Sequence, residues 1–330
     1  MTMTFRDAHE NLRSMVCLGG GHGLFQTLRA ARTLEVPTIT AVVTVADDGG
    51  SSGRIRRELG QIPPGDLRMA LAALARDDDN GRMWEKTLQH RFGGHGALAG
   101  HAVGNLLIAG LADVLGSHIA ALDTVAQLTQ SHGRVVPMSE QPLDIEAEVA
   151  GLDDDPRVIR LVRGQVAVAT TPGSVRRVRL IPSHPPGGRD ALNAIDSADV
   201  VTLGPGSWFS SVIPHLLVPD IVHALAATDA LKVVVLNLTA EPGETSGFSA
   251  ERHIHMLSQH APMLRVDRIL VDATTVNSSV ELANLERAAA SLGAILIAAD
   301  VQEHDENGRP TERHDPVKLA AALKDISLTR

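Results

Sequence analysis

Residues 15–24 read Met-Val-Cys-Leu-Gly-Gly-Gly-His-Gly-Leu, an apolar run followed at once by four glycines and a histidine. The apolar run predicts a short buried strand, and a helical pattern then extends from Leu24 to about Leu34. A β-branched run, Thr38–Val45, predicts a second strand. Strand, glycine turn, helix and strand in this order are typical of the first unit of a doubly wound α/β sheet.

The same alternation of strands and helices continues along the chain. Four further strands are predicted at Val200–Leu203, Lys232–Leu238, Arg268–Val271 and Ala294–Ala298. Helices are predicted from Asp66 to about Ala75 and at Arg82–Gln89, Val103–Leu115, Ile119–Gln130, Ser210–Leu217, Ile221–Thr228, Ser249–His260, Val280–Leu292 and Pro316–Lys324. The polar stretch from Asp300 to Asp315 is expected to loop over the surface.

The segment Arg134–Arg179 has a different pattern, because apolar and polar positions alternate in it. This alternation predicts several antiparallel strands in a subsidiary sheet. We therefore expect residues 1–330 to form a single large α/β domain. Its nucleotide-binding core would comprise 15–133 and 195–300, with 134–182 as a β insertion.

The composition excludes several classes of function. A net charge of −9 and an aromatic content of 2% leave neither the basic face nor the stacking rings that nucleic-acid binding uses. The single cysteine, Cys17, can form no disulfide framework and is expected in the core. No segment is long and apolar enough to span a membrane, and residues 1–14 lack the apolar core of a secretion signal. We expect a cytoplasmic protein.

Four glycine-rich or polar loops, at 19–23, 47–53, 204–207 and 239–245, each follow a predicted strand. The carboxyl ends of parallel strands lie along one edge of a sheet, and ligands bind there at the point where the strand order reverses. The four loops therefore predict one site rather than scattered turns.

The first loop is suited to phosphate. Amide hydrogens at a helix N-terminus attract anions, and glycine lets the backbone approach closely, so Gly20, Gly21, His22 and Gly23 are candidate phosphate ligands. The dinucleotide fingerprint fails, because its third glycine would fall on Leu24 or Gln26, and no P-loop lysine follows. A tight turn between strand and helix is the alternative interpretation.

The second loop carries two carboxylates. Asp47 and Asp48 are candidates for binding ribose or base, for holding Mg²⁺ beside phosphates, and for catalysis if the protein is an enzyme. The neighbouring hydroxyls and amides could bind ligand oxygens, and at least one of the arginines that follow could reach a phosphate. These further candidates are Gly49, Gly50, Ser51 and Ser52, with Arg54, Arg56 and Arg57 behind them.

Weaker candidates lie further along the chain. Asp66 is placed to cap a helix. Asn105, among Leu and Ile, needs a polar partner from the backbone or a ligand. The turn after the strand at Val200–Leu203 predicts a second anion site. The remaining candidate ligand residues are Gly65, Arg68, Gly204, Gly206, Ser207, Thr239, Gly243 and Thr245. The fifteen histidines show no metal-binding motif, so no metal site is assigned to them.

A set of motifs occurs in a fixed order: Gly-Gly-Gly-x-Gly at 19–23, Val45–Arg54, Pro63–Arg68, Gly104–Leu107, Gly204–Ser207 and Pro242–Thr245. This ordered set resembles the gluconeogenesis-factor (YvcK-like, UPF0052) family, relatives of the phospholactate transferase CofD. The resemblance covers about residues 15–300. The chain departs from the pattern at His22, where threonine is usual, and at Met69, where a polar residue is more usual.

The resemblance implies a Rossmann-like three-layer α/β/α sandwich. It also implies a regulatory protein that binds a UDP-sugar such as UDP-N-acetylglucosamine and supports cell shape and cell-wall synthesis during gluconeogenic growth. The alternative that it implies is a Mg²⁺-dependent transferase of a phosphorus-containing group. From the residues alone, an NAD(P) dehydrogenase is a third hypothesis, disfavoured by the failed fingerprint. Oligomeric state is left open, with a homo-oligomer among the possibilities.

Overall fold

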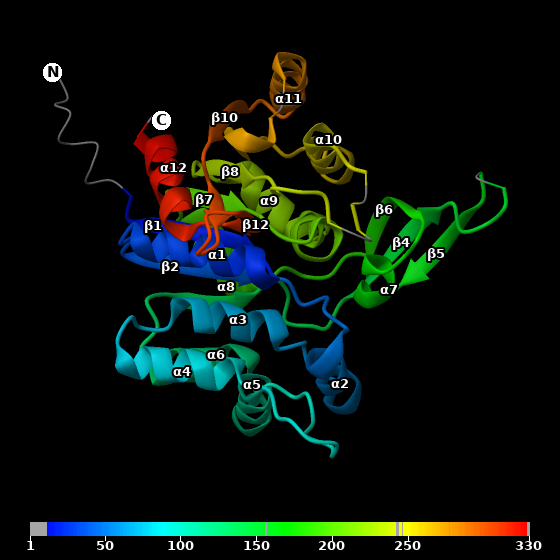
Figure 1. Cartoon of the computed structure of the whole chain (residues 1–330). Helices are drawn as coiled ribbons and strands as arrows, with labels where there is room; N and C mark the ends of the chain where they lie inside the picture. The colour runs from blue at the N-terminus through cyan, green and yellow to red at the C-terminus, as the bar shows by residue number, and fades with distance from the viewer. Residues whose placement is uncertain (1–11, 156, 242–243, 246, 277, 329–330) are drawn as a thin grey trace, which may run out of the picture.

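The computed structural model describes residues 12–155, 157–241, 244–245, 247–276 and 278–328. Its centre is a sheet of seven parallel strands in the order β10-β9-β8-β7-β1-β2-β3 (Figure 1). They are β1 (Ser14–Gly19), β2 (Thr38–Val43), β3 (Arg134–Pro137), β7 (Val200–Leu203), β8 (Leu231–Val235), β9 (Arg268–Asp272) and β10 (Ile295–Ala299). The predicted doubly wound α/β fold is confirmed.

Strand β1 is the central strand of this sheet. It pairs with β2 on one side and β7 on the other, so that Met15 lies beside both Ile39 and Val200. Its apolar side chains are buried, as expected for a parallel strand covered by helices on both faces. Cys17 is fully buried and burial raises the pKa of its thiol to about 12, which confirms the prediction of a core cysteine.

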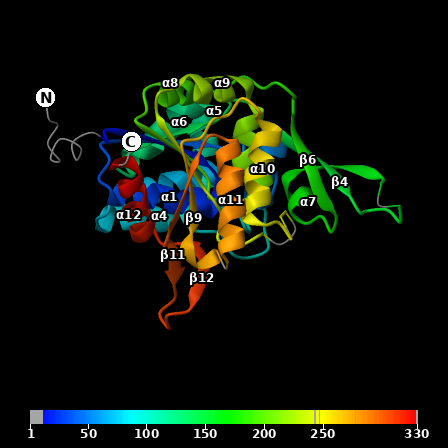
Figure 2. The same ribbon diagram turned by 90° about the horizontal axis from the view of Figure 1, so that it is seen from above.

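Helices form a layer on each face of the sheet. Helix α1 (Gly21–Thr33) covers one face, with α3 (Gly65–Leu74) and α12 (Pro316–Leu328) packed against it. Helices α8 (Arg189–Asp196) and α9 (Pro219–Ala227) pack together on the opposite side (Figure 2). The other α-helices are α2 (Gly50–Leu59), α4 (Asp79–Gln89), α5 (Val103–Leu115), α6 (His118–Leu128), α7 (Gln165–Ala169), α10 (Ala250–His260) and α11 (Ser279–Ser291). The result is a three-layer sandwich.

Short polar side chains determine where four of these helices begin. Asp78, Ser117, Ser249 and Ser278 each accept a hydrogen bond from an amide in the first turn of α4, α6, α10 and α11, respectively. Such N-caps satisfy amide hydrogens that have no partner inside the helix. No side-chain cap closes the N-terminus of α1 or α2, the two helices that start at the glycine-rich loops.

The predicted helix Ser210–Leu217 is not α-helical. The chain forms a π-turn, η2 (Trp208–Val212), followed by a 3₁₀ turn, η3 (Ile213–Leu217). Pro214 has no N–H to donate to the carbonyl of Ser210, so the α-helical ladder cannot continue there. That carbonyl instead accepts the hydroxyl of Thr44, at 3.4 Å, which ties this turn to the end of β2.

The alternating segment forms a small antiparallel sheet in the order β5-β4-β6, which projects from the body of the molecule (Figure 1). Its strands are β4 (Asp144–Ala150), β5 (Ile159–Arg163) and β6 (Ser174–Ile181). The predicted subsidiary sheet is therefore present, but its first predicted strand is not part of it. Residues Arg134–Pro137 form β3 at the edge of the main sheet, where Val135 and Val136 are buried.

The polar tail is not the predicted loop. It forms a hairpin of β11 (Gln302–His304) and β12 (Pro310–His314). Earlier in the chain, the single turn η4 (Ala273–Thr275) follows β9. Asp305 organises the hairpin turn by accepting the amides of Asn307 and Arg309, and Gly308 takes a left-handed conformation there. The amide of Val301 is bound by Asp272 at the end of β9, so the hairpin is anchored to the sheet.

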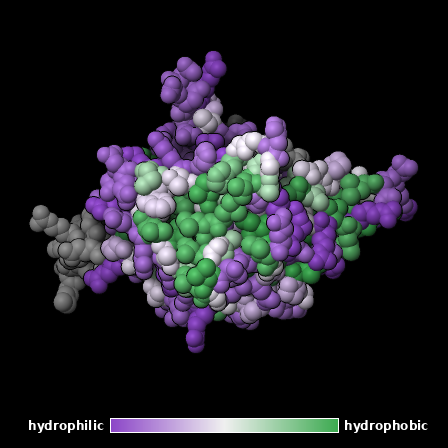
Figure 3. Space-filling view, turned by 90° about the horizontal axis from the view of Figure 1, so that it is seen from below, coloured by the Kyte–Doolittle hydropathy of each residue, from purple (hydrophilic) through white to green (hydrophobic). Residues whose placement is uncertain are grey.

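The lower face of the molecule carries a broad apolar area (Figure 3). Helix α5 lies on this side, and its Val114 and Leu115 are 82% and 46% exposed. Contiguous apolar surface is typical of association sites, so a homo-oligomer stays a prediction. In the described part of the chain no single helix could cross a membrane. The segments 208–217 and 219–227 reach the required length and apolarity only together, bent by 75°.

Leu71→Ala should lower the free energy of unfolding by about 2–5 kcal/mol, because Leu71 of α3 is fully buried and its truncation leaves a cavity. Urea unfolding measures this. Leu59→Ala is the matched control, since Leu59 is 57% exposed and should change stability by no more than about 0.5 kcal/mol. Equal effects of the two substitutions would contradict the described packing of α3.

Candidate functional site

The strand order reverses between β1 and β7. The chain runs from β1 outward through β2 to β3, then returns to β7 on the other side of β1 and continues outward to β10. The loops after β2, β1, β7 and β8 therefore lie in sequence along one edge of the sheet. This is the edge at which open α/β sheets bind ligands.

The loop after β1 is in direct contact with the loop after β7. A Cβ on Gly23 would clash with the carbonyl group of Pro205 and lie 2.7 Å from Cα of Gly206. A Cβ on Gly20 would lie 2.5 Å from a carboxylate oxygen of Asp66 and 3.1 Å from the hydroxyl of Ser211. Glycine is required at these positions because two backbone segments and a carboxylate approach closely.

The first turn of α1 presents amide hydrogens at this edge. Gly21 has φ of +57°, and its amide donates to the carboxylate of Asp66. The first hydrogen bond inside the helix runs from the amide of Leu24 to Gly20, and the amides of His22 and Gly23 meet no acceptor among the described residues. Open amides at a helix N-terminus are suited to an anion.

His22 belongs to the same turn. Burial, followed by the charges of Arg313 and Arg68, lowers the pKa of its imidazole below the usual value. The ring is therefore neutral near pH 7 and can exchange hydrogen bonds with a ligand without adding a charge. In this respect it can stand in for the hydroxyl that the family pattern has at this position.

Two carboxylates, Asp47 and Asp66, lie next to this turn. Asp47 accepts the amide of Gly49 at 2.9 Å and the hydroxyl of Ser52. Burial raises the pKa of Asp47, and burial with the charge of Asp47 raises the pKa of Asp66 to about 7. Asp66 does not cap α3, as the sequence had suggested, since Pro64 holds the cap position.

Asp48 occupies a different place from Asp47. Its carboxylate accepts the amide of Val166 in α7, at 3.0 Å, and so holds the projecting sheet to the β2 loop. Gly164 must lack a side chain because Asp48 lies against it. The carboxyl group that contacts the turn is therefore Asp66, with Asp47 as its charged neighbour, while Asp48 is engaged by α7.

The segment that begins as a loop at Asp47 becomes helix α2 at Gly50, earlier than expected. Ser51 and Ser52 lie in its first turn and are buried. The hydroxyl of Ser51 lies 2.9 Å from Nδ1 of His101 and accepts the side-chain amide of Asn105 at 3.0 Å. Asn105 thus finds the polar partner that its apolar surroundings require, while its buried Oδ1 has none.

Arg68 lies behind the two carboxylates. It is 4% exposed and donates to the side chain of Gln89. Burial, together with the charge of Arg91, lowers its pKa to about 10, while Asp66 and Asp47 act in the opposite direction. Its Nε is buried without a partner. Gly65, at the start of α3, is in contact with the Ser52 hydroxyl.

The turn after β7 is not open to an anion. The amide of Gly206 donates to Oδ1 of Asn237 at 2.9 Å, and the amide of Phe209 donates to Glu244 at 3.1 Å. Burial raises the pKa of Glu244 to about 7. The second predicted anion turn, Gly204–Ser207, is therefore filled by protein groups, and its role is to pack against Gly23.

The loop after β8 is held together internally. The amide of Glu241 donates to the buried hydroxyl of Thr245 at 2.8 Å, so this hydroxyl supports the loop instead of pointing to a ligand. Ser207 hydrogen-bonds Glu241. Thr239 is exposed at the mouth of a cleft, and Gly243 lies outside the described residues.

A cleft of about 140 Å³ lies on the β8 side of the open amides. Its lining comes from four separate segments: His22, Gly23 and Gln26 of α1; Pro205 and Gly206 after β7; Asn237, Leu238, Thr239 and Glu241 after β8; and Glu312, Arg313 and His314 of β12. His314 is 5% exposed, and its Nε2 has no partner. Sequence reasoning missed Arg313 and His314, because no local pattern brings a polar tail to a distant loop.

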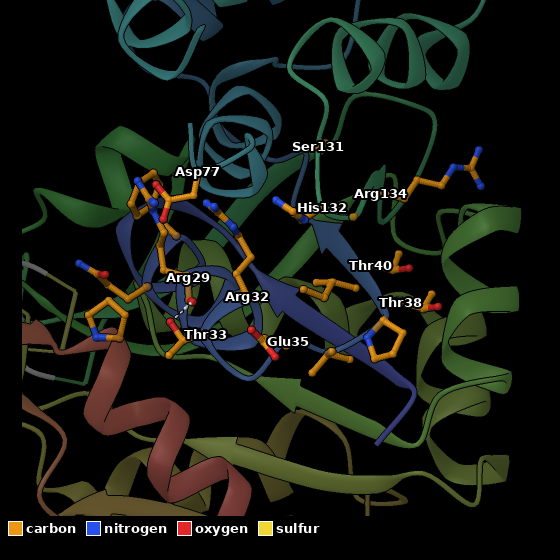
Figure 4. Close-up of a pocket in the computed structure, with 17 residues that line it drawn as sticks. Arg29, Arg32, Thr33, Glu35, Thr38, Thr40, Asp77, Ser131, His132 and Arg134 are labelled. Carbon is orange, nitrogen blue, oxygen red and sulfur yellow. Dashed lines mark hydrogen bonds between the residues drawn. The ribbon is translucent and has the colours of Figure 1, made fainter. Parts of the chain in front are cut away.

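The two largest cavities lie at the opposite edge of the sheet. The first, of about 1040 Å³, carries several cations (Figure 4). Arg29 pairs with Glu85 at 2.7 Å, Arg134 pairs with Asp123 at 2.8 Å, and Arg32 donates to the carbonyl of Ala73 near the end of α3. Arg29 and Arg134 are thus neutralised by carboxylates, and Arg32 lies at a helix C-terminus, where cations are stabilised, so these arginines serve the fold.

No group of three or more His, Cys, Asp or Glu side chains in the described part of the chain is arranged to hold a metal ion. The second large cavity, of about 980 Å³, is lined mainly by aliphatic side chains of α12 and the strand starts. The edge at the carboxyl ends of the strands therefore remains the candidate site. Its open amides lie between the carboxyl groups of Asp47 and Asp66 on one side and the small cleft on the other.

The fold is that of a Rossmann-like α/β protein with a glycine-rich turn at its switch point. The profile of the family described as 2-phospho-L-lactate transferase CofD matches residues 15–315. The chain belongs to this CofD-like family, in the gluconeogenesis-factor (YvcK-like) group.

Individual relatives agree with this assignment. A putative gluconeogenesis factor of Mycobacterium tuberculosis is 59% identical over 313 residues, covering 94% of this chain and 90% of that protein. A gluconeogenesis factor of Halalkalibacterium halodurans is 37% identical over 269 residues, covering 82% and 80%. The crystal structure of a UPF0052 family member from Bacillus halodurans superposes with a TM-score of 0.82 at 34% identity, over 94% of this chain and 99% of that one.

Gly23→Ala should lower the free energy of unfolding by about 1–3 kcal/mol, since the added methyl group forces the β1 and β7 loops apart. Gly110→Ala is the control, because Gly110 of α5 is exposed with open space around it and should be more stable by about 0.5–1 kcal/mol. Urea unfolding of both variants measures the difference. A neutral Gly23→Ala would show that the two loops are not in contact.

Asp66→Asn should raise stability at neutral and alkaline pH. The pKa of Asp66 is about 7 in the folded chain and about 3.9 when unfolded. The unfolded chain therefore loses this proton first, and the stability contributed by the protonated form falls as the pH rises through 7. We expect Asp66→Asn to gain about 1–3 kcal/mol over the natural chain near pH 8, and little near pH 4.

Urea unfolding at both pH values tests this expectation. Asp113→Asn on the exposed side of α5 provides the control and should show no gain that depends on pH. A gain of Asp66→Asn that is the same at both pH values would show that the carboxylate does not titrate as described.

Proposed function

We propose that the protein is a regulatory binder of a nucleoside diphosphate sugar, specifically a UDP-sugar such as UDP-N-acetylglucosamine. In this role it would support cell shape and cell-wall synthesis during growth on gluconeogenic carbon sources. The observation that carries the proposal is the first turn of α1, whose open amides lie at the switch point between two polar surfaces. A diphosphate is the anion that such a turn suits best.

The diphosphate would lie over Gly20–Gly23. On the β2 side, Asp47 with the unpartnered Oδ1 of Asn105 offers acceptors for ribose hydroxyls or a base N–H, and Arg68 offers an unused Nε. On the β8 side, the cleft of about 140 Å³ is the place for the sugar. Thr239, Glu241 and Arg313 supply there the mixture of donors and acceptors that a polyhydroxyl group needs.

A second candidate function is a CofD-like transfer of a phosphorus-containing group. It is favoured by the pair Asp47 and Asp66, which are two oxygen donors of the kind that Mg²⁺ takes beside phosphates. Burial raises the pKa of both carboxyl groups, and the charge of Asp47 raises that of Asp66 further, so a cation bound beside them would relieve this cost. Bound Mg²⁺ would supply Lewis-acid stabilisation of phosphoryl oxygens.

The role of this chain's own residues in either function is the same. The amides of His22 and Gly23 bind and orient the phosphates, and neutral His22 adds a hydrogen bond. Asp66 holds a proton near neutral pH and hydrogen-bonds the amide of Gly21. The Ser–His contact at this edge, from the Ser51 hydroxyl to Nδ1 of His101 at 2.9 Å, is buried and also engaged by Asn105, which favours binding over covalent catalysis.

Ligand-induced stabilisation tests the first proposal. At a concentration of 100 Kd, a UDP-sugar should add about 2.7 kcal/mol to the free energy of unfolding, which at this size corresponds to a melting shift of roughly 4 °C. Arg313→Gln should reduce the shift with UDP-N-acetylglucosamine, because Arg313 lines the cleft and its charge acts on His22 of the phosphate turn. Arg309→Gln, on the exposed hairpin turn, is the matched control.

The absence of any shift with UDP-N-acetylglucosamine, UDP-glucose and UDP would refute the binding proposal. The transferase alternative makes a separate prediction, namely Mg²⁺-dependent release of GMP from a guanosine diphosphate donor when a deazaflavin acceptor is present. No turnover under these conditions would eliminate the alternative and leave the binder in place.

A further inference from the structure

Three arginines beside the site have no carboxylate partner in the part of the chain that the structure describes. Arg54 donates to the carbonyls of Ala97 and Ala99, and Arg91 donates to the carbonyl of Gly100. Arg57 makes no hydrogen bond or ion pair within the described residues. Carbonyl groups orient a guanidinium but do not neutralise its charge.

Some other arginines of the chain have a carboxylate partner. Nine of them form ion pairs, namely Arg29, Arg56, Arg76, Arg82, Arg134, Arg157, Arg160, Arg163 and Arg179. The chain has a net charge of −9, so acidic partners are abundant. Arg54, Arg57 and Arg91 are not among these ion-paired arginines, so within the described residues no carboxylate pairs with the three guanidinium groups of this cluster.

The three arginines line one open cavity of about 660 Å³. Its floor is the start of α2, and its walls are Val166 and Ala167 of α7 and the backbone at Gly100. Helix α2 adds to the positive potential, since it starts at Gly50 without a side-chain cap and points its N-terminus into the cavity. The one carboxylate in the lining, Asp48, is already bound to the amide of Val166.

The side chains of α2 are directed toward this N-terminus. Nη1 of Arg57 lies 3.2 Å from the position that a Cβ on Gly53 would take, one turn earlier in the helix. Nη2 of Arg54 lies 3.7 Å from the corresponding position on Gly100, at the rim of the cavity. Both guanidinium groups therefore lie beside the first turn of α2, where the amides of Gly50 and Ser51 begin the helix.

We infer that this cavity is a second anion site, separate from the diphosphate turn, and that it takes the phosphate group of a small organic phosphate ester. Guanidinium groups bind phosphate through paired N–H donors, and the helix N-terminus contributes its amides. The volume exceeds what an inorganic ion fills, so an organic part has room beside the phosphate. Neither Gly20–Gly23 nor Arg313 lines this cavity, so the inference does not depend on the proposed function.

The site is adjacent to the nucleotide site, because both use the segment from Asp47 to Ser52. A ligand in the arginine cavity would lie next to the nucleoside side of a bound nucleotide. The two sites can therefore be occupied together, as in a protein that senses or joins two phosphorylated molecules.

Calorimetric titration with inorganic phosphate in a chloride buffer tests the inference. We expect the natural chain to bind phosphate, and the double variant Arg54→Gln/Arg57→Gln to bind it at least about tenfold more weakly. Added sodium chloride should weaken the binding further, since the cavity is open to solvent. Arg82→Gln on the exposed side of α4 serves as the matched control and should bind phosphate as the natural chain does.

His22→Ala separates this site from the diphosphate turn, and it should retain phosphate binding while its affinity for UDP falls. Arg57→Gln alone guards against misfolding, because its exposed side chain makes no contact that folding needs; it should weaken phosphate binding with an unchanged melting temperature. The inference is overturned if the natural chain binds no phosphate at tens of millimolar. It is also overturned if the double variant binds normally, or if His22→Ala abolishes phosphate binding.

Discussion

The contact between two backbone turns at the switch point is the constraint on which the site depends. Gly23 of α1 packs directly against the Pro205–Gly206 backbone after β7, and the hydroxyl of Thr27 reaches the carbonyl of Gly204 at 3.4 Å. This contact fixes the start of α1 at the edge of the sheet. The two turns differ in their amides. Those in the first turn of α1 stay open, while those after β7 are bound by Asn237 and Glu244.

The unliganded site is electrostatically unfavourable. Two carboxyl groups, Asp47 and Asp66, are half-buried, and burial raises the pKa of both. A buried acid of this kind is stable only if it is protonated, paired with a cation or hydrogen-bonded. Such pairs are common where a protein must bind charge, so the arrangement points to a ligand that brings a cation or exchanges a proton at this edge.

Strands, most helices and the gathering of the glycine-rich loops at one sheet edge could be predicted from local pattern. The apolar run before Gly19 and the β-branched run from Thr38 fall on β1 and β2, and the alternating positions around Ile145 fall on an antiparallel strand. Errors occurred where a distant partner decides the outcome. Val135 and Val136 join the main sheet because β2 has a free edge there, and the tail folds into a hairpin because Asp272 anchors Val301.

The roles of individual polar residues show the same division. Composition and spacing by themselves determined that this chain is an α/β protein whose glycine-rich loops gather at one sheet edge, because hydrophobic period and turn chemistry are local properties. Only the tertiary structure decided that Asp66, and not Asp48, is the second carboxyl group of the site beside Asp47. It also decided that Glu244 binds amides after β7 and that Arg313 lies near the first turn of α1. Those outcomes depend on which side chains the packing brings within hydrogen-bonding distance and removes from water, and neither distance through space nor burial can be read from positions along the chain.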